Sequence, residues 1–381
     1  MNGAAGKFIG YGLGDSGPDV VKVQRRVIWA YPENSKARQL GVTESGNYDL
    51  ATEQAVRNIQ DYLNRTEPKA AKLGVGERYG VADYATRVRI KAYIPPRLGS
   101  RYKIQGVGGV RSDAYLMPPD APCFNKATAG FAREGVRLTR ELGGGPVIDI
   151  GYSMGAKSAR DYEVALPAEL RDSVKLSIQF GDPSMPADGS LLGDDPGQGI
   201  SRQPHPDYIR DRFYSYSIEG DWYPRATADL LFYLFEIISR AELTLEFATW
   251  LFTQWPTLPF KKLAGVADSS DPLAGILSGL AGVMTDGPTN VIGVLLNPFA
   301  ILAMLPDLID LLVDALKFAM SQAHGKYMDP AEANWDGMTA VDHAVKTIRE
   351  KCPNGATLLL FPGSWAQWNQ GFQFDVALRL Q

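Results

Sequence analysis

The sequence predicts an α/β fold with a mostly parallel sheet, preceded by a small all-helical domain. From about residue 99 onward, short apolar stretches alternate with amphipathic helical stretches. That alternation is typical of parallel strands joined by helices that cover both faces of the sheet. Residues 10–64 carry helix signals only. With 381 residues, 45% of them hydrophobic and 22% charged, the chain is long enough for one large globular domain or two unequal ones.

We expect the helical domain to span residues 1–65 and to contain two amphipathic helices. Gly14–Pro18 offers a cap followed by a proline, which is a helix-start signal, and Asp49 offers a cap for the second helix. Apolar residues then recur at helical spacing, namely Val20, Val23, Val27 and Ile28 in the first helix and Val56, Ile59 and Leu63 in the second. Residues 66–98 are predicted to be a connector.

The larger α/β domain is expected to span residues 99–352. Its predicted strands are 102–105, 147–150, 174–180 and 212–218, and residues 126–142 form a predicted amphipathic helix. Residues 226–320 are strongly apolar and helical in pattern, and we expect them to form a cap. Residues 353–381 are treated as a C-terminal extension without an assigned place, although they contain the apolar run Leu358–Phe361.

The charge balance and the cysteine count narrow the class of protein. A net charge of −4 leaves no basic excess to neutralise phosphates, so we expect no nucleic-acid partner. Cys123 and Cys352 allow one disulfide at most. The N-terminus lacks a charged region followed by an apolar core, so no signal peptide is expected. Residues 287–306 are uncharged, but their prolines and asparagines favour buried or lipid-facing helices over a transmembrane span.

The five residues Gly151–Gly155 spell G-x-S-x-G and are the most informative motif of the chain. An apolar run, Pro146–Ile150, precedes them, and a helix-compatible stretch, Ala156–Arg160, follows them. A serine in such a strand–turn–helix context is held on a strained elbow with its hydroxyl available for attack. We therefore predict that Ser153 is a nucleophile.

A serine nucleophile needs a base to take its proton, and the chain has only three histidines. His324 is favoured because it lies on a loop before the last predicted helix, after the serine in the chain. His343 lies inside that last helix, which suits a mobile base poorly. His205 lies in a loop between two prolines. Both remain alternatives.

The base in turn needs a carboxylate to orient it, between Ser153 and the base in the sequence. Asp221 is favoured because it follows a predicted aromatic strand in a glycine turn. Asp182 and the weaker Glu219 are the alternatives.

An oxyanion hole needs two backbone N–H donors. We expect one from Met154, directly after the nucleophile, and the other from the glycine-rich turn formed by Gly106, Val107, Gly108 and Gly109. That turn lacks the spacing of a dinucleotide loop and the Lys-Ser/Thr of a P-loop. We accordingly expect neither a cofactor nor a metal.

The ordered set of Gly151–Ala156, Glu219–Asp221 and Ala323–Tyr327 resembles the cutinase-like α/β-hydrolases, and within them the lysin B family of mycobacteriophage mycolylarabinogalactan esterases. The resemblance implies an α/β-hydrolase fold with a helical cap, and the triad Ser153, Asp221 and His324. The chain departs from that family's pattern at three positions: Met154 replaces a glutamine, Gln105 a histidine and Asp182 an asparagine.

The N-terminal stretches 14–27 and 49–60 resemble the peptidoglycan-binding domain one family, although Asp49 stands where a second glycine is more usual. Together the two resemblances imply a serine esterase that acts at the bacterial cell envelope during phage-induced lysis. It would be made in the host cytoplasm, would bind peptidoglycan, and would cleave mycolyl-arabinogalactan and other lipid esters. The alternatives are an acyltransferase, a general lipase or cutinase, and a non-catalytic wall-binding phage protein.

Overall fold

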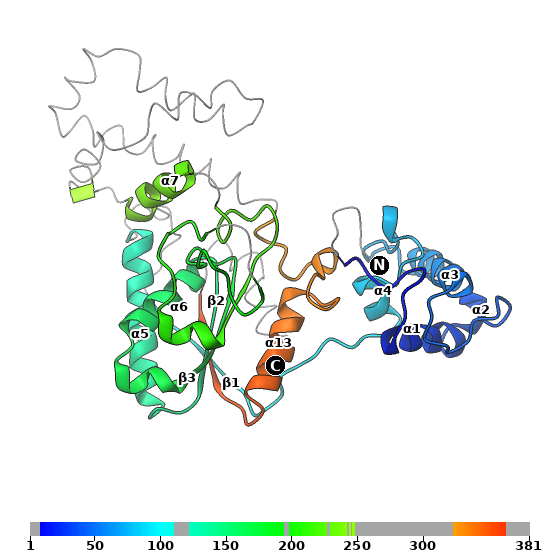
Figure 1. The fold of residues 1–381 in the computed structure, drawn as a ribbon, viewed down its shortest axis with the longest axis horizontal. Coiled ribbons are helices and arrows are strands. Elements are labelled where there is room, and N and C mark those ends of the chain that lie inside the picture. Colours follow the sequence, from blue (N-terminus) through cyan, green and yellow to red (C-terminus); the bar gives the residue numbers. More distant parts are fainter. Residues whose placement is uncertain are drawn as a thin grey trace, which may run out of the picture. The chain divides into compact units, whose positions relative to one another are not determined.

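The protein is described from a computed structural model, shown in Figure 1. The described residues are 8–109, 122–193, 198–226, 229–241, 244, 246–247 and 323–362. Most of the expected cap at 226–320, the uncharged stretch 287–306 and residues 363–381 lie outside these ranges. The chain divides into two compact units, one made of residues 1–98 and 326–350 and the other of residues 99–325 and 351–381.

The larger unit contains a five-stranded, all-parallel sheet with the strand order β1-β5-β2-β3-β4. The strands are β1 Lys103–Gly106, β2 Val147–Tyr152, β3 Val174–Phe180, β4 Phe213–Tyr216 and β5 Thr357–Phe361. The expected parallel α/β sheet is therefore present. The α/β unit also reaches beyond its predicted end at residue 352, because β5 comes from the supposed C-terminal extension and lies between β1 and β2.

Helices α5 (Phe124–Glu141) and α6 (Met154–Ala165) pack on each other, and α6 lies against β2 and β5 (Figure 1). All six residues of β2 are buried. Gly135 of α5 permits this close approach, because a Cβ there would lie 2.8 Å from the ring of Phe361. The remaining elements in the described part of this unit are the short 3-10 helices Ala168–Ser173 and Asp207–Arg212 and helix α7, Asp229–Arg240. Cys123 and Cys352 are both buried free thiols.

The regular elements in the described part of the smaller unit are all helices, joined by turns and loops. They are α1 Pro18–Trp29, α2 Pro32–Ser35, α3 Leu50–Thr66, α4 Tyr84–Arg89, α13 Ala340–Lys351 and two 3-10 helices, Gly76–Arg78 and Pro330–Glu332. The apolar faces of α1 and α3 form its core. Asp49 caps α3 as its sequence position suggests, whereas α1 is capped by Gly17 without a side-chain hydrogen bond.

Two stretches outside the expected module belong to this unit. Residues 66–98, expected as a connector, fold with it, and so do residues 326–350, expected within the α/β domain. Buried polar contacts explain the second addition: Tyr84 donates to Asp342, and Arg87 donates to the carbonyl of Gly337. Such contacts between distant parts of the chain leave no local pattern in the sequence. No helix among the described residues has the length and apolar character that crossing a bilayer requires.

Candidate active site

Ser153 lies at a sharp turn between the end of β2 and the start of α6. Its backbone has φ 59° and ψ −118°, a region that L-residues rarely adopt. Two glycines make room for the turn, since a Cβ on Gly151 would lie 2.5 Å from the backbone of Gly155, and a Cβ on Gly155 would lie 2.3 Å from the carbonyl oxygen of Phe361. Strain kept in place by such tight surroundings is characteristic of functional sites and of the nucleophile elbow in particular.

His324 and Asp221, which are 103 residues apart in the chain, meet in the same unit. His324 Nδ1 lies 2.8 Å from Asp221 Oδ2. The other carboxylate oxygen, Oδ1, accepts the backbone N–H of Tyr223 at 3.0 Å. Asp221 is fully buried and His324 is 3% exposed. A carboxylate in this position fixes the imidazole tautomer with the proton on Nδ1 and leaves Nε2 as the basic nitrogen.

Two aromatic residues hold the imidazole between them. The ring of Tyr152 stacks on His324 with centroids 5.0 Å apart, and its hydroxyl donates to the carbonyl of His324 at 2.6 Å. On another side the ring of Tyr223 lies 4.7 Å from the imidazole. The Nε2 atom of His324 is buried and makes no hydrogen bond to any described residue. A buried nitrogen that is oriented but left unbonded is poised to take a proton.

Ser153 and His324 share their immediate neighbours. Tyr152, which stacks on the imidazole, directly precedes Ser153 in the chain. The N–H of Ser153 donates to the carbonyl of Phe180 at 3.0 Å, and the next residue, Gly181, packs against the imidazole. A Cβ on Gly181 would lie 2.7 Å from His324 Cε1. The structure thus brings the three predicted triad residues into one neighbourhood, and no hydrogen bond joins His324 Nε2 to Ser153.

The candidate oxyanion donors differ in whether their N–H groups are available. Met154 is the first residue of α6, where helix geometry leaves the N–H without an intrahelical acceptor. Val107 donates its N–H to the carbonyl of Leu360 at 2.9 Å, so the sheet already uses it and we remove it from the expected donors. Gly106 pairs with Leu360 as the last residue of β1. Gly108 and Gly109 follow outside the strand.

The alternative triad members have other surroundings. His205 is buried between two carboxylates, Glu163 and Asp182, which occupy both of its ring nitrogens. His343 belongs to the smaller unit, where its Nε2 lies 3.9 Å from Asp336 Oδ2. Glu219 has an exposed side chain on the turn before Asp221.

Three residues of the site were not selected from the sequence as members of it. Tyr152 and Tyr223 flank the imidazole, and Gly181 closes against it. Tyr152 lies within the elbow motif itself and Tyr223 lies two residues after the acid, so proximity in sequence was the available signal. Gly181 has φ 55°, a left-handed backbone conformation that is free of steric strain here because glycine has no side chain.

Comparison with known protein families, with curated proteins and with solved structures finds no match for this chain.

Proposed function

We propose that the protein is a serine esterase with the triad Ser153, His324 and Asp221. The observation that carries the proposal is the oriented imidazole: Asp221 holds Nδ1, the buried Nε2 makes no hydrogen bond to a described residue, and Tyr152, which precedes the strained Ser153, stacks on the ring. Structural histidines in protein cores usually have both nitrogens satisfied, as His205 does here. An unsatisfied imidazole nitrogen in the same neighbourhood as a strained serine has a direct use as a general base.

The chemistry follows from the positions of these groups. Ser153 Oγ attacks the acyl carbonyl while His324 Nε2 accepts its proton. The imidazolium that forms is stabilised by the carboxylate of Asp221. The N–H of Met154 and one from Gly108 or Gly109 donate to the developing oxyanion. His324 then protonates the leaving alcohol, and a water activated by the same nitrogen releases the fatty acid.

The substrate class rests on the resemblance of the ordered motifs to lysin B enzymes. We propose the ester between mycolic acids and arabinogalactan as the bond that is cleaved, at the cell envelope of a mycobacterial-type host during phage-induced lysis. The helices of the smaller unit, with the α1 and α3 motifs noted above, are proposed to bind peptidoglycan and so keep the esterase at the wall.

Replacing the nucleophile tests the activity. The Ser153→Ala variant should lose nearly all hydrolysis of p-nitrophenyl esters and all labelling by a fluorophosphonate probe, while its circular dichroism stays unchanged. Ser158→Ala is a matched control, because Ser158 is a buried serine on the same helix whose hydroxyl donates to the carbonyl of Met154. The control should keep its activity and its labelling.

Two results would contradict the proposal. Turnover by the Ser153→Ala variant would remove the serine from the mechanism. A wild-type chain that neither turns over esters nor reacts with the probe would favour a non-catalytic wall-binding protein. Release of mycolic acids from purified mycolyl-arabinogalactan separates the specific esterase from a general lipase.

A further inference from the structure

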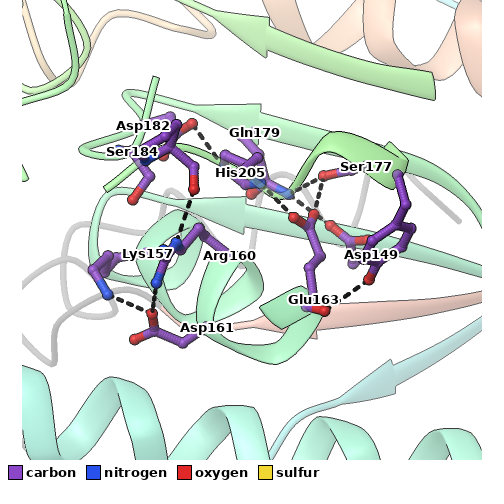
Figure 2. Close-up of polar contacts among 12 residues, drawn as sticks. Asp149, Lys157, Arg160, Asp161, Glu163, Ser177, Gln179, Asp182, Ser184 and His205 are labelled. Carbon is purple, nitrogen blue, oxygen red and sulfur yellow. Dashed lines mark hydrogen bonds and ion pairs between the residues drawn. The ribbon is translucent and has the colours of Figure 1, made fainter. Parts of the chain in front are cut away.

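A second group of charged side chains lies near the candidate site, and the mechanism above does not use it. Figure 2 shows its members, which come from β2, β3, α6 and the loops that follow β3. At its centre is His205, whose Nδ1 lies 2.5 Å from Glu163 Oε2 and whose Nε2 lies 3.1 Å from Asp182 Oδ2. All three side chains are 0% exposed. We call this set the ion triad.

With both carboxyl groups ionised, both ring nitrogens of His205 must donate, so the imidazole carries a positive charge. A neutral imidazole has one N–H, so it can donate to only one of two carboxylates, and its other nitrogen would face the second carboxylate lone pair to lone pair. Burial by itself would lower the pKa of His205, but the carboxylates of Glu163 and Asp182 outweigh it and raise the pKa to about 10. The ring of Phe213, 4.3 Å away, covers the imidazolium.

Among the residues that the structure describes, none supplies the ion triad with a second positive charge at hydrogen-bond distance. Ser177 Oγ donates to Glu163 Oε1 at 2.7 Å, and the hydroxyl of Tyr208 donates to the carbonyl of Glu163 at 2.8 Å. Lys157 is paired with Asp161. Asp149 is also buried, and burial followed by repulsion from Glu163 raises its pKa well above the usual value.

The carboxylates of the ion triad are attached to two parts of the candidate site. Glu163 lies on α6, the helix that begins directly after Ser153. Asp182 directly follows Gly181, the residue that packs against the imidazole of His324. Its second oxygen, Oδ1, accepts the N–H of Ser184 at 2.8 Å, which fixes the turn after β3.

The segment that carries His205 is attached to the same turn and to the acid. Its backbone bonds to the turn through Gly199, which donates to the carbonyl of Met185 at 2.9 Å. It bonds to the acid turn through Ile200, whose N–H donates to the carbonyl of Tyr223 at 2.8 Å. Tyr223 is the residue that both bonds Asp221 and flanks the imidazole.

We propose that the ion triad of Glu163, His205 and Asp182 is a positioning device, which ties the helix of the nucleophile to the two turns that hold the base and the acid. None of the three touches the substrate or the reacting atoms; they act through Gly181 and Tyr223. The inference rests on the proposed esterase activity for its kinetic readout, and a spectroscopic readout makes it testable without that activity.

The kinetic experiment compares three variants of the full chain. In His205→Gln the side-chain carbonyl must face one of the two buried carboxylates, so the turns shift, and a shift near 1 Å lowers kcat about 100-fold. KM for a small p-nitrophenyl ester should stay unchanged. Glu163→Gln keeps a hydrogen bond to the ring and should keep most of the wild-type kcat. Tyr162→Phe removes an equally buried hydrogen bond between α6 and α5, to Thr139 at 2.8 Å, and should leave kcat unchanged.

The spectroscopic experiment uses selective ¹⁵N labelling of the histidine side chains, of which the chain has three. His205 should remain doubly protonated from pH 5 to pH 9 in the wild type. The assignment follows from the Glu163→Gln variant, in which the same signal should titrate at a lower pH. The Nδ1 proton of His324, bonded to Asp221, should shift in His205→Gln and stay in place in Tyr162→Phe.

Each outcome bears on a distinct claim. A His205 signal that titrates near its ordinary pKa in the wild type would overturn the ion triad. A kcat for His205→Gln equal to that of Tyr162→Phe, or an unmoved His324 proton, would overturn the positioning role. A wild-type chain without esterase activity would overturn the proposed function alone, and the His324 proton would still decide the positioning role.

Discussion

Replacing Gly181 with alanine perturbs the candidate site at its tightest contact. Gly181 has φ 55°, and a Cβ built on it would lie 2.7 Å from His324 Cε1 and 3.1 Å from Asp221 Oδ2. The first atom belongs to His324, the predicted base, and the second belongs to Asp221, the predicted acid. The alanine methyl group therefore cannot enter without displacing the pair.

The size of the displacement can be worked from these distances. Carbon atoms in contact prefer separations of about 3.5 to 4.0 Å, so the imidazole must move by roughly 1 Å. A misplacement of that size costs about 100-fold in rate when the base must meet the serine. The left-handed backbone adds an independent loss of about 1–2 kcal/mol in the free energy of unfolding.

The control must share the backbone strain without the collision. Gly143 has φ 62°, and a Cβ built there would meet nothing within 4 Å. Gly143→Ala should therefore lose a similar free energy of unfolding from strain and keep its kcat. The assay is p-nitrophenyl ester hydrolysis at saturating substrate, together with the urea-unfolding midpoint of each variant. If both variants had the same kcat, the imidazole could not lie against Gly181, and the reasoning about the site would fail.

Two further predictions concern the acid and the ion triad. Asp221→Asn should lower kcat about 10⁴-fold by removing the partner that sets the imidazole tautomer, whereas Glu219→Gln should stay active; the reverse order in the same ester assay would reassign the acid. The pKa of His205 is raised to about 10, so its stabilisation is complete below the unfolded-state pKa near 6.5 and is lost as the pH rises through 10. The difference of about 3.5 units corresponds to at most about 5 kcal/mol in the free energy of unfolding. The free energy of unfolding in urea should therefore fall between pH 6 and pH 10 for the wild type but not for His205→Gln. If the two proteins showed the same pH dependence, the raised pKa of His205 would be refuted.

The local parts of the fold could be predicted because short-range physics determines them. Ser153 is preceded by its strand, surrounded by glycines and followed by its helix, all within a short stretch of sequence. The pattern can therefore be recognised from the sequence. Strand β5 shows the opposite case. The sequence pattern places the run Leu358–Phe361 in a C-terminal extension, whereas in the structure it lies inside the sheet, between β1 and β2. A continuous apolar run is typical of a strand buried on both faces, but its place in the sheet depends on pairing with strands more than 200 residues away.

The candidate site was predictable only where order along the chain carries information. The sequence of serine, acid and base favoured Asp221 and His324, which the structure brings to 2.8 Å. The second carboxyl–histidine contact was invisible, because the partners of His205 lie 42 and 23 residues away and each was considered for another role or for none. Residue type alone cannot distinguish a histidine that works as a base from one that is locked between carboxylates.

The location of the ion triad favours orientation over stability as the reason for its presence. A buried ion pair stabilises a fold no better than apolar side chains of similar volume, because desolvation of the charges offsets their attraction. Strands β2 and β3 bury apolar side chains such as Ile148 and Ile178 next to polar ones such as Asp149 and Ser177. Charge-assisted hydrogen bonds have preferred directions, whereas contacts between apolar groups do not. Here those directions lead to the helix after Ser153, to the turn at Gly181 and, through the segment carrying His205, to Tyr223. A device that served stability alone would have no need to end at each of the three places where the proposed catalytic residues are held.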